Sequence, residues 1–323
     1  LVLDRNAFDV PPRDAASFDG EPLRPYNAAP DALLLNFKSL LIQFVPDRAA
    51  NVARVHVEPP MAGVQFPTTV PLSAGDCNDY RTSLRADWTD ATRPRFAGNF
   101  PAVCGEKMWP IAYSAPQQFA GRAVLGMWQQ LGGQLSGQVR EGAVPNGLQP
   151  AFTVDSPTLA EVIRDINKFS NNVMAQQVFL TLSQQQRGVG SFEASRDVMQ
   201  RWWRERVGGD VPVFDNGSGL SREERISAQA LARLLQTAWA SASMPELMSS
   251  LPITGLDGTL KRSKAQFSAH LKTGSLRDVA GIAGFVDGTN GKRWVLVAVL
   301  HHANANAARP ALDAMVDWVA QQP

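Results

Sequence analysis

The spacing of apolar and polar residues divides this chain of 323 residues into two parts of different character. In the first part, short or alternating apolar runs have the period of two that is typical of β-strands. These runs cover residues 32–37, 39–45 and 51–57. Apolar positions at helical spacing follow over 116–131 and end at Gly132-Gly133, and a further strand is expected over 134–140. Residues 1–150 are therefore predicted to form a mostly β module with long connections.

From Val154 onward the apolar positions recur mostly at helical spacing. Ser156 as the N-cap and Pro157 at the first helical position predict where the first helix begins. The expected helices cover residues 158–167, 172–182, 191–207, 226–240 and 307–321. The expected strands cover residues 270–273, 281–287 and 294–301, and the glycines at 288 and 291 favour a hairpin between the last two. This order indicates, for residues 151–323, an α/β domain with helices on both faces of an antiparallel sheet.

The composition narrows the class of protein. Apolar residues make up 44% of the chain and charged residues 19%, as in an ordinary folded protein. A net charge of +1 gives no electrostatic reason to expect nucleic acid or an anionic membrane as a partner. No apolar run approaches the roughly 20 residues of a membrane span, so no transmembrane segment is expected. The residues from Leu1 onward resemble a strand rather than a signal peptide, and we expect an N-terminal part to be missing.

The two cysteines favour a disulfide. Cys77 and Cys104 lie in turn-rich segments, and an even count in such places indicates an oxidising compartment. Two unrelated buried thiols are the alternative interpretation. The four histidines make no metal-ligand spacing with these cysteines, so no metal site is expected.

The most informative motif is Lys272-Thr273-Gly274-Ser275, because Lys-Thr-Gly is one of three elements that mark penicillin-interacting serine enzymes. On a strand, Thr273 and Ser275 share one face, and their hydroxyls form a pair suited to a carboxylate. Gly274 has no Cβ, so a ligand could approach the strand closely there. Lys272 adds a positive charge, and the Ser275 N–H is a candidate oxyanion donor. A strand end with an incidental lysine is the simpler interpretation of the tetrapeptide alone.

A second element of this set, Ser-x-Asn, occurs upstream as Ser170-Asn171-Asn172. Alone, it would be interpreted as a helix N-cap. Its position before Lys-Thr-Gly favours a catalytic role, with Ser170 relaying protons near the leaving group and Asn172 donating to the substrate amide. The third element, the nucleophile motif Ser-x-x-Lys, does not occur, because none of the lysines has a serine three residues before it.

Two other segments carry weaker candidates. Gly217-Ser218-Gly219 is one residue too short for the nucleophile elbow Gly-x-Ser-x-Gly, so we expect a turn there. Ser221 and Glu224 then have the spacing of a capping box at the start of the next helix. Asp257 could act as an acid or base, although an isolated loop aspartate more often forms a turn.

Four segments, INKFSNN, DNGSGLSR, LPITGLDGTLKRS and HLKTGSLRDVAGIAGFV, occur in this order and resemble the class C low-molecular-mass penicillin-binding proteins. That family comprises D-alanyl-D-alanine carboxypeptidases/endopeptidases. The resemblance implies a serine β-lactamase/DD-transpeptidase-like fold over residues 151–323. It also implies that residues 1–150 are an insertion between the nucleophile motif and Ser-x-Asn, which places the nucleophile upstream of Leu1.

The resemblance further implies an acyl-transfer mechanism on D-Ala-D-Ala or cross-link peptides of peptidoglycan. Lys272, Thr273 and Ser275 would anchor a carboxylate, and β-lactams would inhibit by acylating the nucleophilic serine. No cofactor or metal is needed, and a periplasmic location is expected. Two alternatives remain open: a catalytically inactive cell-wall binding or scaffolding protein of the same fold, and an esterase that uses Ser218.

Overall fold

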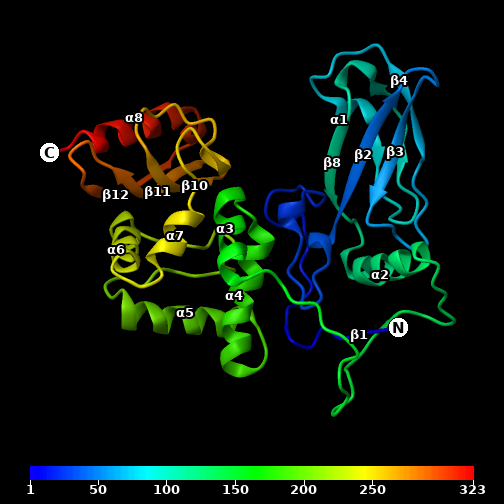
Figure 1. Cartoon of the computed structure of the whole chain (residues 1–323), viewed down its shortest axis with the longest axis horizontal. Helices are drawn as coiled ribbons and strands as arrows, with labels where there is room; N and C mark the ends of the chain where they lie inside the picture. Colours follow the sequence, from blue (N-terminus) through cyan, green and yellow to red (C-terminus); the bar gives the residue numbers. More distant parts are fainter. The chain divides into compact units, whose positions relative to one another are not determined.

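The computed structural model describes residues 1–323, and the chain divides into two compact units, Leu1–Leu148 and Gln149–Pro323 (Figure 1). Each unit has a hydrophobic core of its own. None of the helices combines the length and the apolar character that a membrane span requires.

The first unit is built on a five-stranded sheet in the order β7-β4-β3-β2-β8. Alternate residues of β2, among them Leu40, Ile42 and Phe44, are buried in the core, as the period of two predicts. The elements of this unit are β1 (Val2–Leu3), β2 (Ser39–Asp47), β3 (Val52–Glu58), β4 (Thr69–Ser73), α1 (Tyr80–Leu84), β5 (Ala86–Asp87), β6 (Arg95–Phe96), β7 (Phe100–Pro101), β8 (Lys107–Ala112), α2 (Phe119–Gln130) and β9 (Arg140–Glu141).

The predicted disulfide is confirmed. Cys77 and Cys104 are bonded, with their Cα atoms 5.0 Å apart, and the chain contains no free cysteine. The bond closes a loop that holds α1, β5, β6 and β7. By the chain-entropy model a loop of this size contributes roughly 3 kcal/mol to stability.

The strand predicted over residues 32–37 is wrong. Asn36, Phe37 and Lys38 instead have positive φ angles of 41°, 53° and 51°, which form a left-handed turn before β2. Asn36 tolerates this conformation and donates from Nδ2 to the Ser39 carbonyl at 2.8 Å. The turn lets the Lys38 ammonium reach the buried Asp31 carboxylate at 2.8 Å. The apolar run is therefore interrupted by an ion pair that alternation does not show.

The strand predicted over residues 134–140 is also wrong for most of its length. Only Arg140–Glu141 forms a strand, β9, which pairs in parallel with β1. Gly137 has a φ of 115°, and the Trp128 indole donates to the Gln134 carbonyl at 3.0 Å, so the segment folds back on α2 instead of extending.

The second unit contains the predicted antiparallel sheet, in the order β10-β11-β12, and the hairpin between its last two strands. Helix α8 covers one face of the sheet, where Leu271, Ile282 and Val316 belong to one core cluster (Figure 1). Helices α6 and α7 cover the other face, where Leu235, Met248 and Phe285 form a second cluster. The elements are α3 (Leu159–Phe169), α4 (Asn172–Arg187), α5 (Phe192–Arg206), α6 (Ala228–Trp239), α7 (Met244–Ser250), β10 (Ala269–Ser275), β11 (Val279–Asp287), β12 (Arg293–His301) and α8 (Arg309–Ala320). The expected fold class of this unit, with helices on both faces of an antiparallel sheet, is confirmed.

Two helix starts differ from those predicted. The N-cap of helix α3 is Thr158 and not Ser156, because Thr158 and Glu161 form a full capping box. Ser221 accepts the backbone N–H groups of Glu223 and Glu224 at 3.0 and 3.3 Å, but no helix follows. Helix α6 starts only after Ser227, and the short helix α7 was not predicted at all.

Candidate active site

Ser170 lies at the junction of α3 and α4 in a left-handed conformation. It is the C-cap of α3, with φ 53° and ψ 48°, and its N–H donates to the Ile166 carbonyl. Asn171 is the N-cap of α4 and accepts the Met174 N–H at 3.0 Å. The capping role is thus filled by Asn171, which leaves the Ser170 hydroxyl for other contacts.

The Ser170 hydroxyl meets Lys272, which lies 102 residues later in the chain. Lys272 Nζ donates to Ser170 Oγ at 2.5 Å and to the Thr273 carbonyl at 2.9 Å. No carboxylate pairs with this ammonium, so burial alone lowers the pKa of Lys272 from its ordinary 10.5 to about 8. A lysine with such a pKa exchanges its proton near neutral pH, which suits it to proton transfer.

Asn172, the first residue of α4, connects this helix to the loop that contains Ser218. Its Nδ2 donates to the Ser218 carbonyl at 2.7 Å. The Ser218 hydroxyl itself is buried, donates to Asn216 Oδ1 at 2.5 Å and accepts the Leu220 N–H at 3.1 Å. No base lies beside it, so the esterase interpretation of Ser218 loses its support, and the hydroxyl acts as part of a tight turn.

A second lysine, Lys168, ties the end of α3 to the segment before β10. Its Nζ donates to the Leu251 carbonyl and to Asp257 Oδ2, both at 2.6 Å. Asp257 also accepts the Ile253 N–H at 2.9 Å. Burial by itself would raise the pKa of Asp257, but these hydrogen bonds and the Lys168 charge outweigh it and lower the pKa. Asp257 is therefore a structural ion-pair partner and not the free acid or base considered from the sequence.

Gly258 brings the same segment against the backbone of α3. It has a φ of 53°, and a Cβ there would lie 2.6 Å from the Lys168 carbonyl oxygen, so only glycine fits. The next residue, Thr259, accepts a hydrogen bond from the Thr273 hydroxyl at 2.8 Å. The segment thus connects the helix that ends beside Ser170 to the Lys-Thr-Gly strand.

Strand β10 has one open edge beside these groups. The other edge pairs with β11 along its whole length. On the outer side, Leu271 N donates to the Pro252 carbonyl at 2.9 Å, and the covering segment ends there. Because N–H directions alternate along a strand, the N–H groups of Thr273 and Ser275 face the same outer side. Gly274 is exposed, and nothing lies within 4 Å of where its Cβ would be.

The Ser275 hydroxyl lies at the start of α8. It donates to Asn306 Oδ1 at 2.9 Å and accepts from Arg309 Nη2 at 2.9 Å. The sequence did not point to Arg309 or to Lys168 as functional residues. Lys168 lies in INKFSNN and Asp257 in LPITGLDGTLKRS, two of the segments that carry the family resemblance, whereas Arg309 lies in none of them.

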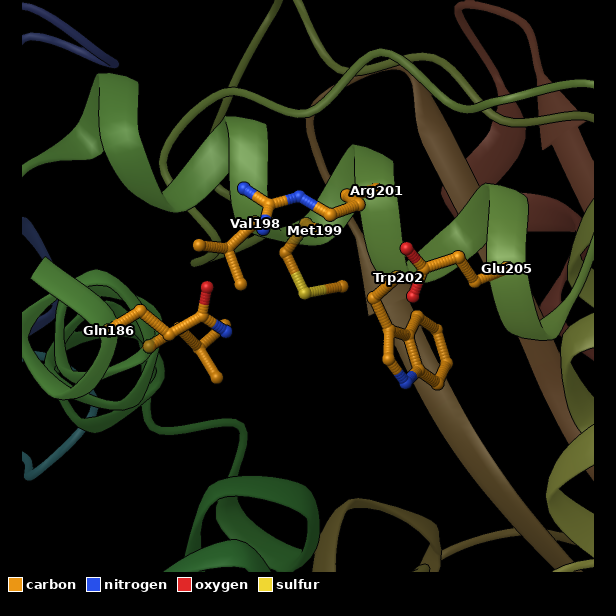
Figure 2. A pocket seen from close by; sticks show the side chains of 7 residues that line it. Gln186, Val198, Met199, Arg201, Trp202 and Glu205 are labelled. Carbon is orange, nitrogen blue, oxygen red and sulfur yellow. The ribbon is translucent and has the colours of Figure 1, made fainter.

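The structure also contains a hollow of about 440 Å³ between α4 and α5. Figure 2 shows Met199 and Trp202 on its wall with Gln186, Arg201 and Glu205 around them. The α4 residues that line it lie at least 10 positions beyond Asn172, which is about 15 Å along the helix. None of the motif residues lines this hollow.

The comparison with known protein families shows to which family the chain belongs. The model of the D-Ala-D-Ala carboxypeptidase 3 (S13) family matches residues 1–322. The chain belongs to the S13 family. The resemblance seen in the four sequence segments is thereby confirmed.

Two curated relatives are D-alanyl-D-alanine carboxypeptidases. The one from Actinomadura sp. (strain R39) is 29% identical over 209 residues, which cover 60% of this chain and 39% of the relative. DacB from Haemophilus influenzae is 24% identical over 194 residues, which cover 57% of this chain and 40% of the relative. The matched stretches thus span about two fifths of the length of these relatives.

A solved structure has the same fold as this chain. Penicillin binding protein 4 (dacB) from Haemophilus influenzae superposes with a TM-score of 0.75 at 19% identity, over 99% of this chain and 74% of that one. A structure of the same H. influenzae protein in complex with a β-lactam gives a TM-score of 0.62 at 18% identity and covers 90% of this chain and 70% of that one.

Proposed function

We propose that the protein is a serine DD-peptidase that cleaves D-Ala-D-Ala or cross-link peptide bonds of peptidoglycan through an acyl-enzyme. The observation that carries this proposal is the contact between Ser170 Oγ and Lys272 Nζ at 2.5 Å, which joins two motif elements 102 residues apart. It occurs in a chain of the S13 family whose curated relatives are named D-alanyl-D-alanine carboxypeptidases. The nucleophile belongs to a Ser-x-x-Lys motif upstream of Leu1.

The Ser170–Lys272 pair carries the proton in this mechanism. When the acyl-enzyme forms, the C–N bond breaks and the leaving amine needs a proton. Ser170 Oγ donates that proton and recovers one from Lys272 Nζ, whose pKa of about 8 favours the transfer near neutral pH. In deacylation Lys272 Nζ regains its proton, through Ser170, from the attacking water. The lysine of the Ser-x-x-Lys motif, which took the hydroxyl proton of the nucleophile during acylation, returns it to that serine.

The strand edge and Asn172 position the substrate. The Ser275 N–H, on the open side of β10, supplies one oxyanion donor, and the nucleophile's own backbone supplies the second. Asn172 uses one amide N–H on the Ser218 carbonyl and keeps the other for the substrate amide. Thr273, Gly274 and Ser275 form the strand that the substrate lies against.

A periplasmic location and inhibition by β-lactams belong to the same proposal. The disulfide between Cys77 and Cys104 supports an oxidising compartment. The complex of the H. influenzae penicillin binding protein 4 with a β-lactam supports β-lactam binding by this fold. The first unit, in this proposal, is an insertion between the nucleophile motif and Ser170.

Labelling with a fluorescent penicillin tests the proposal. The full-length protein, which includes the segment before Leu1, should take one covalent label, and the 323-residue chain alone should take none. Failure of the full-length protein to label at high penicillin concentration would leave the non-catalytic cell-wall binding protein as the better description. Stoichiometric acylation of the 323-residue chain would show that the nucleophile lies within these residues.

A further inference from the structure

The segment DNGSGLSR lies in a closed loop between α5 and α6. The loop covers residues 213–225, and Val213 and Arg225 join its two ends by exchanging backbone hydrogen bonds at 2.9 and 3.1 Å. The segment carries part of the family resemblance, yet the proposed mechanism gives it no role beyond one carbonyl group, that of Ser218. The contacts inside the loop determine where this carbonyl lies.

The half-buried Glu224 side chain turns back into the loop. Its Oε1 accepts the N–H groups of Asp215 at 3.4 Å and Gly217 at 3.3 Å, so it holds the backbone on both sides of Asn216. Burial raises the pKa of Glu224 and outweighs these hydrogen bonds, which lower it, and the Asp215 charge adds to the rise. The carboxylate is therefore kept inside the loop against a desolvation cost, and what it contributes there is its contact with the backbone.

The same part of the loop is pressed against α4. Gly217 has a φ of 73°, and a Cβ there would lie 2.5 Å from Phe179 Cγ, so the loop backbone lies directly on the helix. The buried Asn216 side chain accepts the Ser218 N–H at 2.9 Å. The peptide groups held by Glu224 are therefore the ones that lead into Ser218.

The Ser218 carbonyl determines which end of the Asn172 amide faces the loop. Asn172 Nδ2 donates to this carbonyl at 2.7 Å. A carbonyl oxygen accepts hydrogen bonds and donates none, so it excludes the flipped amide, whose own oxygen would face it. The acceptor is a backbone group and does not depend on the Ser218 hydroxyl. The direction of the second Asn172 N–H therefore depends on the position of the loop backbone.

We propose that Glu224 is a positioning residue that holds the Ser218 carbonyl where it orients the Asn172 amide. The inference rests on the proposed function, in which Asn172 donates to the substrate amide. Glu224 acts through Asn172 and not on the reacting atoms. Its removal should therefore slow the reaction of compounds that present an amide to Asn172 and leave the reaction of compounds without that amide almost unchanged.

The experiment compares two β-lactams that differ in one amide. Benzylpenicillin has an acylamino side chain, and 6-aminopenicillanic acid has a free amine in its place. In the full-length protein, Glu224→Ala should slow acylation by benzylpenicillin about 10- to 100-fold, because a misplaced positioning group costs up to that much. Acylation by 6-aminopenicillanic acid should change less than about twofold. Glu224→Gln, which keeps an oxygen acceptor, should lie between the wild type and Glu224→Ala with benzylpenicillin.

Glu223→Ala is the matched control. It removes the same charge one residue away, from an exposed side chain, and both acylation rates should stay within about twofold of the wild type. Equal slowing with both β-lactams in a folded Glu224→Ala, or no slowing with either, would overturn the inference. Thermal unfolding identifies a variant that has lost its fold. If Glu224→Ala has lost it, the ratio of the two rates in Glu224→Gln gives the answer instead.

A double-variant cycle tests whether Glu224 acts through Asn172. With benzylpenicillin, Asn172→Ala should slow acylation at least as much as Glu224→Ala, and adding Glu224→Ala to it should cost less than about a further twofold. The same loop also contacts the turn after β10, where Arg222 Nη1 lies 2.7 Å from Asp278 Oδ1. Losses that multiply in the double variant would mean that Glu224 acts on such a contact, and they would overturn its role through Asn172.

Fluorescent penicillin labelling of the same preparations separates this inference from the proposed function. A labelled wild type with no selective loss in Glu224→Ala overturns the role of Glu224 alone. A full-length wild type that takes no label overturns the proposed function, and the inference with it.

Discussion

Lys168 and Lys272 lie in the same unit and are both largely enclosed, yet their surroundings differ in one respect. Lys168 has a carboxylate partner, Asp257, at 2.6 Å. Lys272 has only a hydroxyl and a carbonyl as acceptors, and its pKa falls to about 8. The two lysines therefore differ in whether a carboxylate partner is present, and the proposed proton-transfer role of Lys272 depends on its having none.

The largest effect should come from Lys272→Met in the full-length protein. Loss of a positioned proton donor costs about 10²- to 10⁴-fold in rate, so penicillin acylation should slow by that amount. The thermal midpoint should not fall, because no buried carboxylate is left without a partner. Stopped-flow or gel-based labelling measures the rate. A variant that labels at the wild-type rate would show that Lys272 is only structural.

Lys168→Met should act on stability. Removing one partner of an enclosed ion pair leaves Asp257 uncompensated, and its partial exposure limits the cost to about 3 kcal/mol in the free energy of unfolding. Urea unfolding measures the loss. The double variant Lys168→Met/Asp257→Asn should recover part of it, since no unpaired charge remains. The comparison of the two lysines breaks down if Lys168→Met is as stable as the wild type but does not label.

The pH dependence of stability provides a further test of the pKa of Lys272. In the unfolded chain Lys272 keeps its proton up to its ordinary pKa of 10.5, whereas in the folded chain it loses it near 8. Between these values the unfolded state binds more protons, so the free energy of unfolding should rise with pH. We expect about 2 kcal/mol from this group, less than the full shift implies because Lys272 is only partly buried.

Unfolding experiments from pH 7 to 10.5 test this dependence. The rise should be smaller in Lys272→Met by the contribution of that group. Lys264→Met, which removes an exposed lysine, is the control and should follow the wild type. Parallel curves for the wild type and Lys272→Met would show that the pKa of Lys272 is ordinary.

The smallest effect should come from Ser218→Ala. Its hydroxyl holds a turn through Asn216 and Leu220, so the change should cost about 1 kcal/mol of stability and leave penicillin labelling within about twofold. This result would show that the role of the Ser218 hydroxyl, like the roles of Lys168 and Lys272, depends on its hydrogen-bond partners. Complete loss of labelling with the fold intact would instead revive Ser218 as a nucleophile.

The elements that were predicted correctly are those whose structure depends on residues close together in the sequence. The three strands from 269 to 301 and their hairpin follow from apolar runs and the glycines between them. The start of α3 could not be predicted in this way, because Ser156 and Thr158 are both good N-caps. Only the hydrogen bond from the Thr158 backbone N–H to the Glu161 side chain distinguishes them. The left-handed turn at 36–38 depends on an ion pair with Asp31, which no periodicity reveals.

The same division applies to the candidate site. The motifs singled out Ser170 and Lys272, and the structure places these two side chains in contact. The role of Lys168 was not found because it comes from Asp257, which lies 89 residues later in the chain. A short motif identifies the residues of a strand or a helix cap. The residues that contact the motif in the folded protein depend on tertiary packing and cannot be found from the motif.

The partly covered edge of β10 has a consequence for association between chains. An uncovered strand edge is a template on which other strands add, and it promotes aggregation. Here the segment that ends at Thr254 occupies the first half of the edge, with Thr254 N donating to the Ala269 carbonyl at 3.1 Å. Only the stretch from Lys272 to Ser275 remains open, about 13 Å at 3.3 Å per residue. That length admits the end of an extended peptide and is shorter than the roughly five to six residues of a typical strand, which limits the addition of a second protein strand.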